Sequence, residues 1–127
     1  MKTFPELLEE ANAEIKSVSP EELKQQLDNE EIILVDVRSK DAIEAEGQIE
    51  GSVHVPRDML EFHADQRTDN PLRKEELDPE KKIVVYCGVG GQGTLSTKTL
   101  QDMGYKDVSN LSGGTNAWVK AGFELKK

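Results

Sequence analysis

The stretch Lys82-Ile83-Val84-Val85-Tyr86-Cys87-Gly88-Val89-Gly90-Gly91-Gln92-Gly93 joins a short apolar run to a glycine-rich loop. Residues 82–86 have the length and the β-branched composition of a buried strand. The four glycines that follow allow positive φ angles, so several backbone N–H groups can converge on one point. A helix is expected from Thr94 to Met103, ended by Gly104. Strand, loop and helix in this order predict one unit of an α/β fold.

Cys87, the only cysteine of the chain, lies where the strand meets the loop. The loop N–H groups and the positive end of the following helix dipole should favour the thiolate, so we predict a nucleophile at this position. A buried structural cysteine before an ordinary glycine turn is the alternative, but the order of elements favours chemistry. A single cysteine excludes an internal disulfide and a multi-cysteine zinc site. No metal and no cofactor is expected.

Strands and helices alternate on both sides of this stretch. Strands are expected at 31–37, 52–55, 82–86 and, as a short edge strand, 106–108; helices are expected at 4–15, 19–29, 39–46, 58–62, 72–77, 94–103 and 115–120. Ser19, Pro20 and Glu22 form a capping box at the second helix. The pattern predicts a parallel sheet with helices on both faces. We expect one domain, residues 1–127, with residues 1–16 as an amphipathic helix packed on it.

The charge balance excludes several classes of partner. Sixteen basic and twenty-five acidic residues give the 127-residue chain a net charge of −9, which argues against nucleic acid and anionic membranes as partners. The N-terminus turns acidic too early for a signal peptide, and no apolar run could span a membrane. We therefore expect a cytoplasmic protein. We also expect a monomer or a weak homodimer.

Four segments in the right order resemble signatures of the single-domain rhodaneses, which are thiosulfate sulfurtransferases and their relatives. The likeness covers about residues 17 to 124. Gln48 and Glu50 stand where the second signature usually has His and Pro. The four segments are Leu34-Val35-Asp36-Val37-Arg38, residues 47–56, residues 84–93 and residues 111–122.

The resemblance implies a compact doubly wound, mostly parallel five-stranded sheet with helices on both faces. It also implies a sulfurtransferase that works through a persulfide. The Cys87 thiolate would attack the outer sulfur of thiosulfate or a similar small-molecule donor, release sulfite, and carry the sulfur to a thiol, cyanide or a protein acceptor. Backbone amides after the cysteine can stabilise a persulfide anion, so no separate general base is required. The residues expected to bind the substrate are Gly88, Val89, Gly90, Gly91, Gln92 and Arg57.

Two loop positions depart from related patterns. The family loop commonly has arginine where this chain has Gln92. Cysteine phosphatases that share the fold have a loop one residue longer that ends in arginine, where this chain has Gly93, so no side chain would clamp a phosphoryl group. Arg57 could supply the missing charge, or it could be a solvated arginine paired with Asp58.

Asp36 and Arg38 are expected to support the loop region as a structural ion pair. Three functions remain open at this point. The first is the sulfurtransferase with Cys87 as its nucleophile. The second is a catalytically weak rhodanese-like module with a binding or regulatory role, which Gln92 and the acidic surface favour. The third is a redox-sensing thiol, which also needs a readily ionised cysteine.

Overall fold

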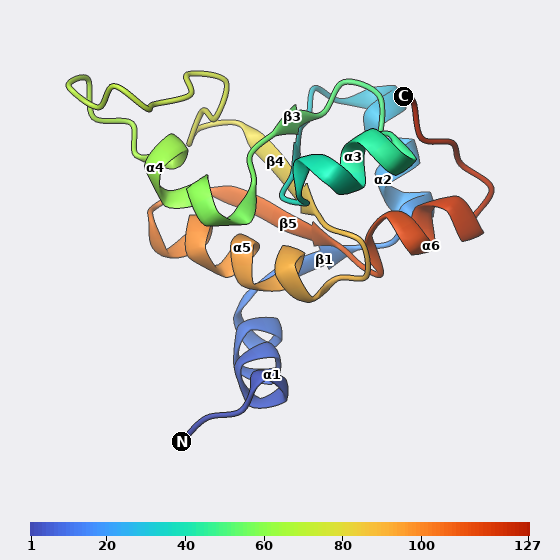
Figure 1. The fold of residues 1–127 in the computed structure, drawn as a ribbon, viewed down its shortest axis with the longest axis horizontal. Helices are drawn as coiled ribbons and strands as arrows, with labels where there is room; N and C mark the ends of the chain where they lie inside the picture. Colours follow the sequence, from blue (N-terminus) through green and yellow to red (C-terminus); the bar gives the residue numbers. More distant parts are fainter.

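The computed structural model describes residues 1–127 and contains one parallel sheet of five strands in the order β1-β5-β4-β2-β3 (Figure 1). Every pair of neighbouring strands is parallel. The predicted fold class is therefore confirmed. The strands are β1 (Lys16–Val18), β2 (Ile33–Asp36), β3 (Val53–His54), β4 (Lys82–Tyr86) and β5 (Asp107–Leu111).

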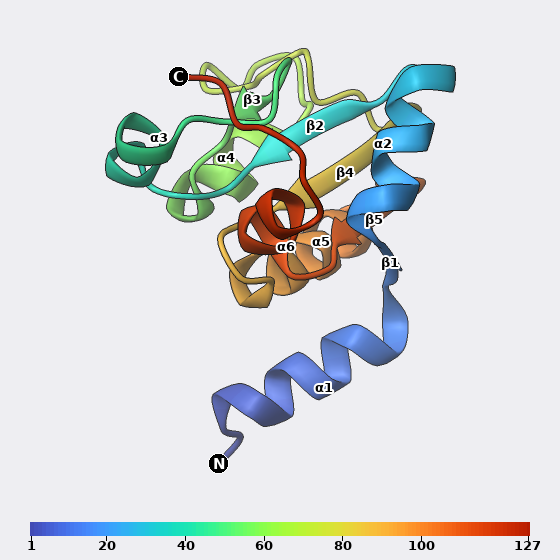
Figure 2. The same ribbon diagram turned by 90° about the vertical axis from the view of Figure 1, so that its right-hand side faces the viewer.

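Helices cover both faces of the sheet (Figures 1 and 2). They are α1 (Phe4–Glu14), α2 (Pro20–Asn29), α3 (Lys40–Glu46), the 3₁₀ turn η1 (Arg57–Met59), α4 (Leu60–Ala64), α5 (Gly91–Asp102) and α6 (Gly114–Lys120). The capping box predicted at Ser19 is present, with Glu22 as its partner. None of these helices has both the length and the apolar character needed to cross a membrane.

The apolar run of β4 is continuous because both faces of this strand are covered. Ile83 and Val85 belong to one hydrophobic cluster, to which α4 and α5 contribute Leu60 and Leu100. The alternate residues of β4 join a second cluster, which includes Leu23 of α2 and Trp118 of α6. Side chains alternate across a strand, so a strand with a core on each side needs apolar residues at every position.

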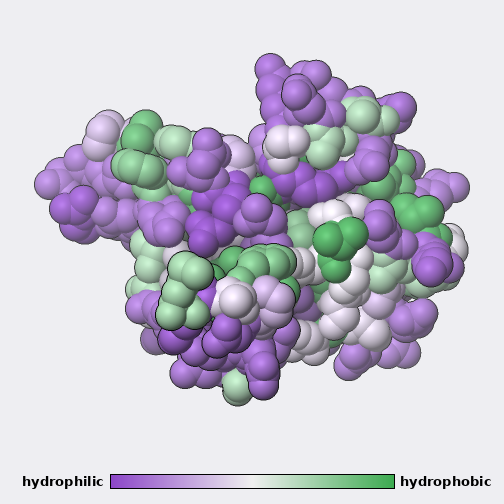
Figure 3. Space-filling view, turned by 60° about the horizontal axis from the view of Figure 1, so that its bottom comes forward, coloured by the Kyte–Doolittle hydropathy of each residue, from purple (hydrophilic) through white to green (hydrophobic).

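Helix α1 projects from the rest of the chain in Figures 1 and 2 and packs against α5. Ala11 is its only buried residue, and the side chains of Phe4 and Leu7 remain 56% and 42% exposed. Figure 3, in which this end of the molecule faces the viewer, shows hydrophobic residues interrupted by hydrophilic ones. A capping box at Thr3 starts the helix.

Three expectations for local structure were wrong. Residues 72–77 form turns instead of a helix, since the amide of Lys74 donates to the carbonyl of His63 and not to a residue one helical turn earlier. Strand β5 is longer than predicted and lies inside the sheet, because the short strand β1 pairs along its outer side. Helix α5 begins at Gly91, three residues before the predicted start.

A buried ion pair lies at the end of β2. Asp36 is fully buried, and it accepts hydrogen bonds from Nε and Nη2 of Arg38 at 3.1 and 2.8 Å. Arg38 also donates to Glu46 at 2.9 Å and to the carbonyl of Gly47 at 2.6 Å. Burial disfavours the charged guanidinium, but the hydrogen bonds and charge of Asp36 outweigh this and raise the pKa of Arg38. The pair joins β2 to the end of α3.

We predict that Asp36→Asn lowers the free energy of unfolding by about 3 kcal/mol, because it leaves a buried cation without its counter-charge. The measurement is chemical denaturation of the wild type and the variant. The matched control is Asp65→Asn, since Asp65 pairs with Arg67 at the same sequence spacing but on the surface, where the arginine side chain is 72% exposed. A surface pair contributes little, so equal losses in the two variants would contradict the prediction.

Candidate active site

The carboxyl ends of β2, β3 and β4 open into one cleft of about 750 Å³. Cys87 directly follows β4, and Arg38 and Arg57 lie beyond the ends of β2 and β3. All three line the cleft, together with Gly88, Val89 and Gln92 of the glycine loop. We call it the Cys87 cleft. In a parallel sheet the strand ends meet at one edge, which is why residues so far apart in the sequence gather here.

The loop brings a backbone amide to the sulfur of Cys87. The N–H of Gly90 donates to Cys87 Sγ at 3.0 Å. Gly90 reaches this position with φ of +113°, in the left-handed region that favours glycine. It is also the N-cap of α5. The first amides of a helix have no intrahelical acceptor, and Gly90 has no side chain to cap them. Unpaired amides beside a sulfur stabilise negative charge on it.

Helix α6 holds the other side of the loop. The amide of Thr115 donates to the carbonyl of Cys87 at 2.8 Å, and that of Asn116 donates to the carbonyl of Gly88 at 3.0 Å. The loop approaches α6 so closely that a Cβ on Gly114 would overlap the carbonyl oxygen of Cys87. Residues of α6 were not among the predicted site residues, although the paired glycines Gly113 and Gly114 are a sequence signal of such a close approach.

Gly93 lies in the first turn of α5 and is buried against β5. An added Cβ would overlap the side-chain oxygen of Asn110 and lie 3.4 Å from the amide nitrogen of Cys87. The position therefore has no room for the arginine side chain that phosphatase loops carry at their end. Among loop side chains, only Gln92 can offer polar hydrogens to a ligand in the cleft.

The charges of the Cys87 cleft are mostly paired. Arg57 is 30% exposed and contacts Glu61 at 3.4 Å, so its partner is not the neighbouring Asp58 that the sequence suggested. Arg38 lines the cleft but its guanidinium is committed to Asp36 and Glu46. Arg57 is therefore the cation of this cleft with the weakest pairing.

The structure does not gather all the predicted site residues in one place. Asp36 lies behind the cleft, where it binds Arg38. Gly90 and Gly91 line a smaller pocket of about 300 Å³ on the other side of the loop, toward α1 and β5. Although Gly90 lines this smaller pocket, its N–H group still donates to the sulfur of Cys87.

A model of the rhodanese-like domain matches residues 19–121, which is most of the chain. The chain belongs to this family. A sulfurtransferase from Allochromatium vinosum is 30% identical over 112 residues, which are 87% of this chain and 94% of that protein.

Solved structures give the same result for the fold. The human single-domain sulfurtransferase TSTD1 superposes with a TM-score of 0.71 at 28% identity, covering 82% of this chain and 95% of the human protein. A protein of unknown function from Rhodopseudomonas palustris, described as a possible tyrosine phosphatase, superposes with a TM-score of 0.92 at 34% identity. The superposition covers 99% of this rhodanese-like chain and 96% of the Rhodopseudomonas palustris protein. Relatives named sulfurtransferases support a sulfurtransferase role of the rhodanese type.

We predict that Gly90→Ala slows alkylation of Cys87 by iodoacetamide about tenfold, because a residue with a Cβ resists φ of +113° and the relaxed loop moves its amide away from the sulfur. Mass spectrometry over time measures the rate. Gly104→Ala is the control, since Gly104 has φ of +100° and open space around it. It should lose similar stability but alkylate like the wild type, and equal slowing in both variants would refute a local effect of Gly90.

Proposed function

We propose that this rhodanese-like protein is a sulfurtransferase in which Cys87 carries the transferred sulfur as a persulfide. The Cys87 thiolate attacks the outer sulfur of thiosulfate, a new S–S bond forms, and the bond to the sulfonate breaks so that sulfite leaves with the electron pair. Total charge is conserved, because a thiolate and a dianion give a persulfide anion and sulfite. A thiol, cyanide or a protein acceptor then removes the outer sulfur and restores the thiolate.

The observation that carries this proposal is the contact between the Gly90 amide and Cys87 Sγ. A thiolate held by a backbone donor needs no neighbouring general base, and no histidine lines the Cys87 cleft. The unpaired first amides of α5 can follow the charge when it moves to the outer sulfur of the persulfide. The cleft can hold a donor much larger than thiosulfate.

Phosphatase chemistry is less well supported, although one structural relative is described as a possible tyrosine phosphatase. A phosphoryl dianion needs a bidentate cationic clamp at the end of the loop. Gly93 occupies that place and is pressed against Asn110. A persulfide carries a single negative charge, which backbone amides can accommodate without such a clamp.

Incubation of the reduced protein with thiosulfate should add one sulfur atom to the intact mass, and a thiol should remove it. Cys87→Ser is the control and should gain nothing, since the chain has no other cysteine. If thiosulfate adds no mass, a polysulfide donor is tried next. No sulfur on Cys87 from either donor would contradict the proposal and favour the binding or regulatory module. Oxidation by peroxide faster than any sulfur loading would favour the redox-sensing thiol.

Arg57→Ala should lower kcat/KM for thiosulfate about tenfold, which corresponds to one weakened charge-assisted contact. Arg73→Ala is a matched control, since Arg73 is 25% exposed, also pairs with a glutamate and does not line the cleft. The reverse test is Gln92→Arg, which should raise kcat/KM if cationic charge limits thiosulfate binding. Unchanged kinetics in Arg57→Ala would show that Arg57 only forms a surface pair with Glu61.

A further inference from the structure

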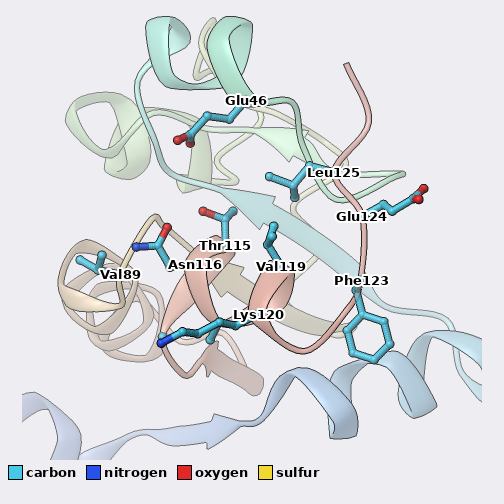
Figure 4. A pocket seen from close by; sticks show the side chains of 11 residues that line it. Glu46, Val89, Thr115, Asn116, Val119, Lys120, Phe123, Glu124 and Leu125 are labelled. Atoms are coloured by element: carbon cyan, nitrogen blue, oxygen red, sulfur yellow. The ribbon is translucent and has the colours of Figure 1, made fainter.

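A second cleft adjoins the Cys87 cleft. It has a volume of about 940 Å³ and lies between α6 and the C-terminal segment, as Figure 4 shows. We call it the α6 cleft. Its apolar side chains include Val89, Val119, Phe123 and Leu125. In Figure 4, Val89 of the glycine loop is at one end and Phe123 at the other, with Val119 and Leu125 between them.

The two clefts meet at the glycine loop that carries Cys87. Val89 and Glu46 line both of them. Val89 is 72% exposed at the tip of the loop, and Val119 on α6 is 52% exposed. The chain itself covers neither side chain, so an apolar surface lies open directly beside the sulfur site. Exposed apolar surface next to a reactive group is typical of a place where a partner binds.

We propose that the α6 cleft binds the sulfur acceptor, and that this acceptor is a protein thiol on an extended, basic segment with an apolar side chain beside its cysteine. The inference rests on the proposed persulfide function of Cys87. The acceptor cysteine would enter the Cys87 cleft while its apolar neighbour crosses Val89 and packs on Val119. Neither thiosulfate nor cyanide has a group that could use this surface.

The negative charge of the chain is the reason to expect a basic acceptor. Acidic side chains slightly outnumber basic ones around the two clefts: Glu46, Asp58, Glu61 and Glu124 against Arg38, Arg57 and Lys120. The whole chain has a net charge of −9, so an acidic partner is repelled on approach and a basic one is attracted. The apolar lining sets the position of the partner after this encounter.

Transfer to such an acceptor requires no oxidant or reductant. The acceptor thiolate attacks the outer sulfur of the Cys87 persulfide and forms a new S–S bond. The bond between that sulfur and Cys87 Sγ breaks, and Cys87 leaves as a thiolate. The acceptor becomes a persulfide, so the two sulfur centres exchange roles and the electrons balance.

The test measures how fast acceptors discharge a preloaded Cys87 persulfide in a single turnover. The probes are capped peptides of sequence Lys-Leu-Cys-Leu-Lys, Lys-Ser-Cys-Ser-Lys and Glu-Leu-Cys-Leu-Glu, with cyanide as an acceptor too small to reach α6. The basic, apolar peptide should react about tenfold faster than each of the other two, which is the ratio that one extra favourable contact gives. Equal rates for the three peptides would overturn the proposal.

Val119→Ser locates the contact. It should lower the ratio of peptide discharge to cyanide discharge about fivefold for the basic apolar peptide, since part of one apolar contact is lost. Leu72→Ser is the control, because Leu72 is 43% exposed in the turns between α4 and β4 and lines neither cleft. A fall of the same size in Leu72→Ser, or an unchanged ratio in Val119→Ser, would rule out the α6 cleft.

A binding measurement separates this inference from the proposed function. The peptide Lys-Leu-Ser-Leu-Lys cannot accept sulfur, but it should bind the α6 cleft whether or not Cys87 forms a persulfide. Binding can be followed by the single tryptophan, because the Trp118 ring lies 4.7 Å from that of Phe123, which lines the cleft. Weaker binding to Val119→Ser than to wild type supports the site even if sulfur loading fails, and no binding to wild type contradicts it.

Discussion

The glycine loop has its shape because α6 takes its carbonyl groups. Two amides at the start of α6 bind the carbonyl oxygens of Cys87 and Gly88. With these oxygens turned toward α6, the N–H of Gly90 is free to meet the sulfur from the other side. The contact is possible only because Gly114 has no Cβ, since a side chain there would overlap the loop backbone. One pair of hydrogen bonds thus links the last helix of the chain to the proposed nucleophile.

The cleft beside this loop depends on a second constraint, the buried pair of Asp36 and Arg38. Arg38 is held by Asp36, Glu46 and the carbonyl of Gly47, and these contacts attach α3 to the carboxyl end of β2. Because these partners occupy its N–H donors, Arg38 lines the cleft but is not free to bind an anion. Anion binding in the Cys87 cleft is therefore left to the loop amides, with Arg57 as the one weakly paired cation.

The sequence predicted those features that depend on local patterns. The apolar run of β4 and the capping box at Ser19 each have a direct physical cause, and they lie where expected. Of the loop glycines, Gly90 brings its N–H group to the sulfur. What it could not predict depends on distant partners. Strand β1 has three residues, two of them exposed, and becomes a strand only by pairing with β5. That pairing is also why β5 is not an edge.

The same limit applies to other local structure, both outside the site and in it. Residues 72–77 have good helix formers, but the carbonyl of His63 captures the amide of Lys74 and Leu77 is drawn into the core. Helix α5 starts at Gly91 because Gly90 takes a left-handed conformation, which the glycine allows but does not require. Sequence also offered Asp58 as the partner of Arg57, whereas a helical turn of η1 and α4 brings Glu61 into reach instead.

Gln92 is easier to understand from these contacts than from the loop sequence alone. An arginine at this position would add charge to a cleft whose other cations are paired with carboxylates, and it would favour small dianions. A neutral glutamine adds no positive charge against the overall negative field of the chain. Such a field weakens attraction for thiosulfate and strengthens it for a basic partner. The replacement that makes the protein a poorer match to the usual loop therefore fits a sulfurtransferase whose acceptor is a basic protein thiol.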